Sequence, residues 1–425
     1  MRKKFRKFKK LFCNDYIFSV FQKIMNILTG LVTVSLINRY LGPSLKGEYT
    51  YITNIVTVLA VILGFGFYES YPFSKRKKKE KQLEAYLNVF FMQFLFYLLI
   101  GAAIAFVTKN RIVTLVAVLV PVQVFTSQMQ MVGIVEFIRF RQILQIVNYF
   151  IDMLLTLTAY LLIPQSVSVL LFILLIKDIL YIVVYLIKCG YFPKKFVIDT
   201  KFIVFLFKFG CFAMLTKLLI ELNYRIDVLM LKLFVPYAEI GLYSVGSKLA
   251  QYVWLIPDAF KEVIYARTAK SDAVNEIKFV LKLNLSITVF IILFILLFGK
   301  VIIYLLFGTD YIAAYSVTCI IFFGIPSMVL YKIISPLYMA NGKQKKCFCI
   351  LLASVIANMT ANMIFIPLIG KFGAAVSTVL SYSICGCVFY ISFIRDYHLK
   401  WYEGFFFSKE EIQKIKKYVK NFVHS

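Results

Sequence analysis

The sequence predicts an all-α, polytopic membrane protein with about twelve transmembrane helices. The chain of 425 residues is 61% hydrophobic and only 16% charged, whereas a soluble globular protein is about half apolar and about a quarter charged. Apolar runs of roughly 20 residues, the length needed to cross a bilayer, recur along the whole chain. Lysines and arginines gather in the short connections between these runs, as expected for a membrane protein with many spans.

The apolar runs give the position of each predicted span. The first set lies near residues 12–38, 47–70, 84–107, 112–133, 143–163 and 167–188. The second set lies near residues 203–233, 241–264, 278–306, 313–339, 346–367 and 372–394. Because a polar stretch separates the two sets, we expect an N-terminal six-helix bundle at 1–190, a cytoplasmic linker at 191–202, a C-terminal six-helix bundle at 203–396 and a cytoplasmic amphipathic tail at 397–425.

The net charge of +27 does not indicate a nucleic-acid partner, because the sequence offers no soluble domain to hold a binding groove. Alternate connections carry most of the basic residues, from the N-terminal MRKKFRKFKK to the tail after residue 395. Basic loops remain in the cytoplasm, so the pattern predicts an even number of spans with both termini cytoplasmic. It also predicts contacts with anionic membrane lipids. The N-terminus lacks a small-residue cleavage site, which favours a retained first span over a removed signal peptide.

The end of the chain, Ser408–His424, predicts a cationic amphipathic helix. One face of this helix would carry Ile412, Ile415, Val419 and Phe422, and the opposite face would carry lysines. Helices of this kind lie in the plane of the membrane interface. We therefore expect the tail to anchor on the inner leaflet.

Charged side chains inside the predicted span 203–233 are the first candidates for a functional site. Lys217, Glu221 and Arg225 are spaced four residues apart and therefore share one face of a helix. Ionisable groups at membrane depth are costly, and they usually pair with one another or face a wet cavity. Two interpretations stay open: a structural ladder of ion pairs between helices, or a site for a charged group of a substrate.

Three further residues extend this candidate site. Lys248 lies in the next predicted span, and Lys23 lies on a polar face of the first span. For either lysine alone, snorkelling to the interface or a local salt bridge is the simpler explanation. Asp227, like Glu221, would balance these cations or carry a coupling proton or sodium ion, because protonation removes the cost of burying a carboxylate.

A short pattern recurs at matching positions of the two halves. In each half a proline that stops a helix is followed by Gly-x-Tyr, formed by Pro43, Gly47 and Tyr49 and then by Pro236, Gly241 and Tyr243. A duplicated six-helix unit would give such a match. With an even number of spans in each unit, the repeats would be parallel and related by an axis along the membrane normal.

These motifs resemble those of the oligosaccharide flippases, the Wzx-type members of the multidrug/oligosaccharidyl-lipid/polysaccharide exporter superfamily. The resemblance rests on Asn38-Arg39-Tyr-Leu-Gly42-Pro43 with Gly47 and Tyr49, on Arg225-Ile-Asp227 with Glu239-Ile-Gly241-Leu-Tyr243-Ser244 and Ser247-Lys248-Leu249, and on Lys371-Phe-Gly-Ala-Ala-Val-Ser377. The matches extend over nearly the whole chain. One departure is Val245-Gly246, where the family often has Gly or Ala after Tyr-Ser.

The resemblance implies two six-helix bundles around a central cavity that opens alternately to the two sides of a bacterial inner membrane. The implied substrate is an undecaprenyl-pyrophosphate-linked oligosaccharide, moved from the cytoplasmic to the outer leaflet for capsule, O-antigen of lipopolysaccharide, or exopolysaccharide assembly. The four cations named above would receive the pyrophosphate, since lysine and arginine pair well with phosphate. The two carboxylates would hold these cations or take a coupling proton or sodium ion. A polysaccharide polymerase and glycosyltransferases are the implied partners.

The sequence predicts neither an enzyme nor a cofactor. No phosphate-binding G-x-x-x-x-G-K-[ST] motif occurs, and the loops are too short for the paired acids of a membrane glycosyltransferase. The eight cysteines lack metal-type spacing and only two histidines accompany them, so we expect no metal site. Three alternatives stay open: a multidrug exporter of the same superfamily, a flippase for a lipid-linked cell-wall precursor, and a membrane polysaccharide polymerase.

Overall fold

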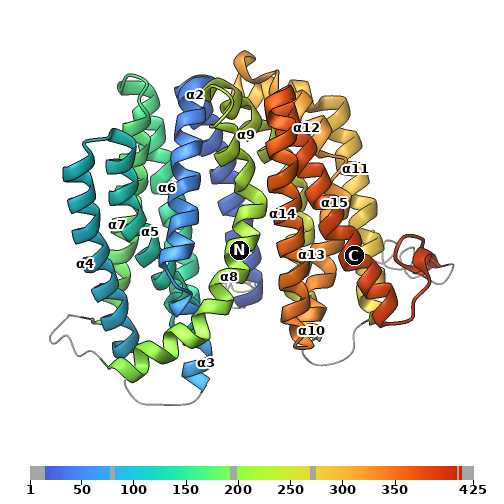
Figure 1. Cartoon of the computed structure of the whole chain (residues 1–425), viewed down its shortest axis with the longest axis horizontal. Helices are drawn as coiled ribbons and strands as arrows, with labels where there is room; N and C mark the ends of the chain where they lie inside the picture. Colours follow the sequence, from blue (N-terminus) through green and yellow to red (C-terminus); the bar gives the residue numbers. More distant parts are fainter. Residues whose placement is uncertain (1–14, 77–81, 192–198, 269–273, 409–410, 414–425) are drawn as a thin grey trace, which may run out of the picture. The chain divides into compact units, whose positions relative to one another are not determined.

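The chain is helical throughout the part that the structure describes. The structure is a computed structural model that describes residues 15–76, 82–191, 199–268, 274–408 and 411–413, and it contains no strand within these ranges (Figure 1). The chain divides into two compact units, Met1–Leu218 and Leu219–Ser425. Part of the predicted linker, 192–198, lies outside the described residues, and the predicted domain boundaries stay predictions.

The first unit is built from long helices. It contains α2 (Asp15–Leu63), η1 (Phe67–Ser70), α3 (Tyr71–Arg76), α4 (Gln82–Thr108), α5 (Arg111–Glu136), α6 (Ile138–Leu162), α7 (Val167–Cys189) and the first part of α8 (Thr200–Leu231). Within α2, Gly42 has a φ of 65°, which breaks the helix where Pro43 follows. Glycine adopts this conformation without a steric penalty, and proline removes a helical hydrogen-bond donor. The two parts of α2 are therefore the first two predicted spans.

The second unit has more interruptions. After the rest of α8 it contains α9 (Tyr237–Gln251), η2 (Tyr252–Trp254), α10 (Leu255–Thr268), α11 (Val274–Phe307), η3 (Thr309–Tyr311), α12 (Ala314–Ile321), α13 (Ile325–Ala340), α14 (Gln344–Ile369), α15 (Lys371–Asp396) and η4 (Trp401–Gly404). The helices α12 and α13 are bent by 53° relative to each other, and Pro326 lies in the first turn of α13.

The helices confirm the predicted polytopic, all-α fold. The first two predicted spans are the two parts of α2, and each of the others coincides with one helix or with a run of consecutive helices. Among the described residues, nine helices are long and apolar enough to cross a membrane, and the bent pair α12 and α13 makes ten. This count is below the predicted twelve because α2 contains two spans and because η2 interrupts the segment formed by α9 and α10.

Glycines allow α15 to pack closely against its neighbours (Figure 1). A Cβ atom on Gly386 would lie 1.9 Å from the carbonyl oxygen of Ser327 on α13, and one on Gly373 would lie 2.1 Å from that of Phe365 on α14. Small residues in membrane helices permit backbones to approach in this way. The close packing brings polar side chains of α14 and α15 within hydrogen-bonding distance of one another.

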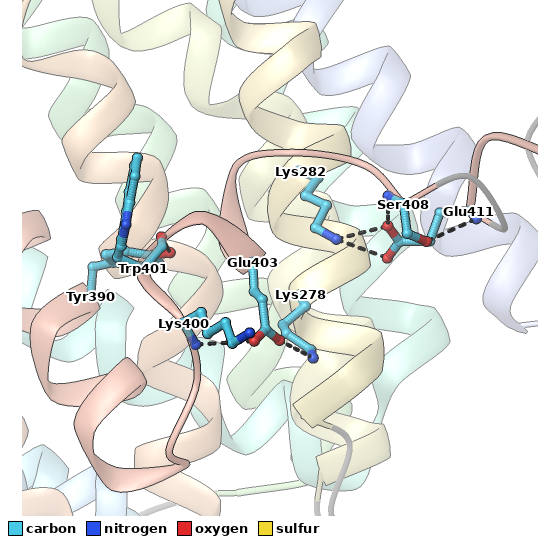
Figure 2. A network of polar contacts seen from close by, with 8 residues as sticks. All are labelled: Lys278, Lys282, Tyr390, Lys400, Trp401, Glu403, Ser408 and Glu411. Atoms are coloured by element: carbon cyan, nitrogen blue, oxygen red, sulfur yellow. Dashed lines mark hydrogen bonds and ion pairs between the residues drawn. The ribbon is translucent and has the colours of Figure 1, made fainter.

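The C-terminal tail is fastened to α11 by two ion pairs. Figure 2 shows Lys278 against Glu403, at 2.9 Å, and Lys282 against Glu411, at 2.8 Å. The Lys282 side chain is only 6% exposed. Both lysines belong to the first turns of α11 and are one helical turn apart. One face of α11 therefore holds the tail at two points, Glu403 and Glu411.

Two further contacts shape the tail. The hydroxyl of Tyr390 on α15 donates to the carbonyl oxygen of Trp401 (Figure 2). Ser408 and Glu411 each accept from the other's backbone N–H, at 3.2 and 2.7 Å, which is the capping box that begins a helix. The predicted amphipathic helix thus has a start at this point, and most of its length, 414–425, lies outside the described residues.

Candidate functional site

The charged stripe predicted on α8 is present. Arg225 Nε donates to Glu221 Oε2 at 2.6 Å, and the two side chains are 33% and 22% exposed. Because the residues are four apart, the helix itself brings them together. Because neither side chain is fully buried, a charged ligand could reach the pair.

Lys217, one turn earlier on α8, lies in the first unit. Its amino group donates to the hydroxyl of Tyr68 at 2.7 Å and lies 4.9 Å from the centre of that ring. Tyr68 is almost fully buried in η1. A lysine over the face of a tyrosine is attracted by the ring as well as by the hydroxyl, so Tyr68 holds the amino group of Lys217 in place within the first unit.

The structure brings two of the predicted cations together in the second unit. Lys248 on α9 is exposed, and Arg225 lies within electrostatic range of it. Lys248 also lies 5.8 Å from the ring centre of Tyr252. Lys23, in contrast, lies on α2 in the first unit. The second unit thus holds two of the predicted cations, Arg225 and Lys248, within electrostatic range of each other.

Asp227 is the centre of a separate, buried cluster. Its side chain is 2% exposed. The hydroxyls of Tyr243 and Thr378 each donate to Oδ2 at 2.8 Å, and the amide of Asn362 donates to Oδ1 at 2.7 Å. All three donors are neutral, and no lysine or arginine among the described residues forms an ion pair with Asp227. The structure therefore pairs Glu221 with a cation but not Asp227.

More polar groups continue the Asp227 cluster along α8, α14 and α15. Asn362 also donates to Asn358 at 2.5 Å. One turn earlier on α8, Asn223 donates to Ser354 at 3.1 Å and accepts from Ser381 at 2.7 Å. All of these residues are fully buried. These buried hydrogen bonds connect α8, α14 and α15 inside an otherwise apolar unit, although Asn358 Nδ2 and Asn362 Oδ1 have no partner among the described residues.

The cluster has the composition of a site for a small cation. The side-chain oxygen of Asn362 is buried without a hydrogen-bond partner in the described part of the chain. Buried polar atoms are nearly always satisfied, so an acceptor beside a carboxylate that has no protein donor is available to contact a cation. Hard cations prefer carboxylate, amide and hydroxyl oxygens. Three or more His, Cys, Asp or Glu side chains do not gather anywhere in the described ranges, so the cluster differs from a transition-metal site.

Sequence reasoning singled out Asp227 but missed its partners. They come from α9, α14 and α15, and Asn362 and Thr378 lie 135 and 151 residues away from Asp227. A signal was nevertheless present: Ser354, Asn358 and Asn362 recur every four residues inside an apolar run. Such spacing marks one polar face of a buried helix.

Several residues of the family motifs shape the backbone, where they break or begin helices. Gly42 and Pro43 make the break in α2, and Pro236 is the N-cap of α9. Gly47 and Gly241 are buried, Arg39 is exposed, and Tyr243 donates to Asp227 as described above. The corresponding Tyr49 in the first unit lies within electrostatic range of Lys177, Asp152 and Asp178. In both units, then, the tyrosine of the repeated motif lies near a buried carboxylate.

Two other ion pairs involve charged residues of the predicted spans. Lys177 contacts Asp152 at 3.1 Å, and Lys332 contacts Asp258 at 2.7 Å. Lys332 also lies 4.8 Å from the ring centre of Trp254. Each of these carboxylates is balanced by its own lysine, as is usual for charges within membrane spans.

The fold resembles that of several solved transporters. The fold matches the lipid II flippase MurJ in an inward closed conformation, with a TM-score of 0.72 and 15% identity, over 89% of this chain and 87% of that one. It also matches a multidrug resistance MATE family transporter of the MOP superfamily in an inward-facing conformation, with a TM-score of 0.68 and 13% identity, over 87% and 94%. A MOP superfamily transporter from Pyrococcus furiosus gives 0.59 and 12%, over 88% and 92%.

The sequence itself matches two family models. One, described as lipid II flippase MurJ, covers residues 264–419. The other, described as polysaccharide biosynthesis protein, covers residues 12–256, more than half of the 425-residue chain. Among curated proteins, none matches the chain in sequence. The chain has the fold of the MOP superfamily transporters and belongs to the polysaccharide biosynthesis protein family.

Proposed function

We propose that this protein is a flippase that moves a polyprenyl-pyrophosphate-linked oligosaccharide from the cytoplasmic to the outer leaflet of a bacterial inner membrane by alternating access. Its family and its transporter fold support the reaction class. The basic connections predict that both termini lie in the cytoplasm. The observation that carries the substrate class is the grouping of Arg225 and Lys248 in the second unit, where Glu221 forms an ion pair with Arg225.

A pyrophosphate cannot cross hydrocarbon without compensation for its lost hydration. Burying an unpaired charge is very costly, whereas lysine and arginine form strong, charge-assisted hydrogen bonds with phosphate oxygens. Arg225 and the exposed Lys248 provide more positive than negative charge at this point of the second unit, and Lys217 adds a cation in the first. The hydroxyl-rich sugar needs only polar, hydrated surroundings.

Transport in proteoliposomes tests this proposal. The substrate is a fluorescent, short-chain polyprenyl-pyrophosphate oligosaccharide, and chemical quenching from outside reports its leaflet. Because a hydrogen bond to a charged group contributes about 1.5–3 kcal/mol, Arg225→Ala should slow transport about 10- to 150-fold. Arg225→Lys should restore part of the rate. Lys300→Ala, which removes an exposed lysine near the Tyr315 ring, is the matched control. Unchanged transport by Arg225→Ala would remove this residue from the substrate site.

We further propose that the Asp227 cluster binds the coupling ion, sodium or a proton. Asp227 with the oxygens of Asn358, Asn362 and Thr378 would hold the ion, whose charge would balance that of the carboxylate. The support is the buried carboxylate with neutral donors and the orphaned amide oxygen of Asn362. A bound ion would favour the packing of α8 against α14 and α15.

Thermal unfolding tests ion binding separately from transport. A ligand at 100 times its dissociation constant stabilises the folded state by about 2.7 kcal/mol, so sodium should raise the unfolding temperature of the wild type relative to choline. Asp227→Asn should abolish this shift. If sodium has no effect on the wild type, transport under an imposed pH gradient tests the proton instead. If the wild type and Asp227→Asn respond identically both to sodium and to the pH gradient, the ion site is refuted.

One other substrate is favoured by a specific observation. The second half of the chain matches the MurJ family model, and the fold matches that of MurJ. A lipid-linked cell-wall precursor also presents a pyrophosphate, so the same cations would serve it. Parallel assays with lipid II, the oligosaccharide substrate and a cationic drug distinguish the two flippase activities from multidrug export.

A further inference from the structure

An apolar cavity lies within the first unit, apart from the charged residues of α8. It has a volume of about 540 Å³ and is enclosed by α5, α6 and α7. Its floor is formed by Leu119, Ala159 and Leu171, which are 3%, 1% and 1% exposed. Small-molecule sites commonly have volumes of about 300–1,000 Å³. The cavity is thus large enough for part of an organic ligand and almost entirely hydrocarbon in character.

The opposite side of the cavity is open. Val118, Ile163 and Phe172 line it and are 41%, 43% and 60% exposed. The three helices that enclose it are all long and apolar enough to cross a membrane. Because exposed apolar side chains of such helices are expected to face the hydrocarbon of the bilayer, an alkyl chain is the kind of group that would meet the opening.

A polar rim closes one end of the cavity. Arg111, the first residue of α5, donates through Nη2 to the hydroxyl of Ser168 at 2.9 Å. Ser168 lines the cavity, and so does Leu115, one helical turn after Arg111. The Arg111 side chain is 59% exposed and lies 3.9 Å from Glu48. A guanidinium group has five donors, so most of its hydrogen-bonding capacity remains for another acceptor.

The α4–α5 junction carries positive charge, although basic residues are expected mainly on the cytoplasmic side. The basic connections predict that the junction of α4 and α5 faces outward, where lysines and arginines are scarce. Nevertheless Lys109 and Arg111 both occur there, and both are exposed. Arginine at the level of the headgroups, directly above an apolar cavity, matches the two ends of an anionic lipid.

We propose that this cavity binds an anionic phospholipid of the outer leaflet, with one acyl chain between α5, α6 and α7 and the phosphate on Arg111. Arg111 pairs with Glu48, so Lys109 and Arg111 together leave the rim with one net positive charge. A phosphodiester carries a single negative charge and matches this rim, whereas a pyrophosphate requires more cations than it offers. The closed floor also limits the chain that the cavity accepts, since a polyprenyl carrier is far longer than one acyl chain. The site is independent of the proposed transport substrate.

Native mass spectrometry of the purified, full-length protein tests the site. The protein is titrated with phosphatidylglycerol, phosphatidylcholine or undecaprenyl phosphate in separate experiments. Because a hydrogen bond to a charged group contributes about 1.5–3 kcal/mol, Arg111→Ala should weaken phosphatidylglycerol binding about 10- to 150-fold. Arg111→Lys should lose less. Val118→Trp should fill the opening and lower binding of the same lipid.

Matched variants separate specific binding from general lipid contact. Val147 on α6 is 45% exposed, close to the value for Val118, and does not line the cavity, so Val147→Trp should leave binding unchanged. Lys46→Ala removes a cation expected on the same side, at the ring of Tyr49, and should also leave binding unchanged.

Three results would overturn the proposal. Equal binding of phosphatidylglycerol by the wild type and both Arg111 variants would exclude the headgroup contact. Equal affinity for phosphatidylcholine would exclude selection of an anionic lipid. Preferential binding of undecaprenyl phosphate would assign the cavity to the carrier lipid instead. Because each readout is binding and not transport, failure here leaves the proposed flippase function untouched.

Discussion

Replacing Glu411 with glutamine should release the C-terminal tail from α11 (Figure 2). Glu411 accepts from Lys282 at 2.8 and 3.0 Å and from the Ser408 backbone N–H at 2.7 Å. Removing one member of a buried ion pair costs about 3–5 kcal/mol when the remaining charge stays buried. Here the Lys282 side chain is 6% and that of Glu411 20% exposed, so water compensates in part. We expect a loss of about 2 kcal/mol of tail docking.

Hydrogen exchange of the tail amides measures this loss. About 2 kcal/mol corresponds to a roughly 30-fold change in the equilibrium between docked and released tail, so amides of residues 397–408 should exchange up to about 30-fold faster. Glu403→Gln is the matched comparison. Its ion pair is more exposed, at 17% for Lys278 and 31% for Glu403, and exposed pairs contribute about 0–1 kcal/mol.

A second variant checks the cause of the effect. Lys282→Met removes the ion pair but leaves no unpaired buried lysine, and the remaining Glu411 is the more exposed partner. This variant should therefore accelerate exchange less than Glu411→Gln does. Equal exchange in Glu411→Gln and the wild type would refute the reasoning. A larger effect of Glu403→Gln than of Glu411→Gln would also refute it, because burial would then not determine the energy of these pairs.

Three other perturbations follow from the same structure. Acid should undock the tail. The hydrogen bond from Lys278 lowers the pKa of Glu403. Burial alone would raise the pKa of Glu411, but the hydrogen bonds from Lys282 and Ser408 outweigh burial and lower that pKa. Docking is then complete above the ordinary glutamate pKa of about 4.3 and is lost as the pH falls below it, and exchange rates that do not change with pH would contradict this. Gly386→Ala should lower the unfolding temperature at a cost of about 1–3 kcal/mol, because its Cβ meets the Ser327 carbonyl, whereas Gly30→Ala, whose nearest neighbour is 3.9 Å away, should not; equal midpoints would contradict the close packing. Tyr243→Phe should cost about 1.5–3 kcal/mol in the same assay by removing a hydroxyl donor from Asp227, and an unchanged midpoint would show that this bond does not stabilise the fold.

The span pattern and the pair on α8 were predictable because both depend on local order. Apolar runs of membrane length fix each helix, and a spacing of four residues brings Glu221 and Arg225 together on any α-helix. The bend at Gly42 and Pro43 was predictable as a helix stop for the same reason, since the conformational limits of proline act on its own neighbours.

Contacts between distant segments were not predictable in this way. The tail was expected to act through its apolar face, yet its acids Glu403 and Glu411 pair with lysines 125 and 129 residues away. Likewise nothing in one sequence indicates which polar residues of α14 and α15 meet Asp227. Such pairing is set by the packing of whole helices. Glycines such as Gly386 permit close packing, but their positions in the sequence do not show which helices will pack together.

The contacts of the carboxylates within the predicted spans fit the coupling role proposed for Asp227. Asp152 and Asp258 are neutralised by Lys177 and Lys332 in direct contacts, and Asp178 lies within electrostatic range of Lys177. A carboxylate already paired with a lysine gains little from a further cation, because the pair is neutral as a whole. Asp227 has only neutral donors in the described part of the chain, and burying it as an anion without a counter-ion is costly. A mobile cation would remove that cost when it binds and restore it when it leaves. The packing of α8 against α14 and α15 would then depend on the ion, which is what coupling to transport requires.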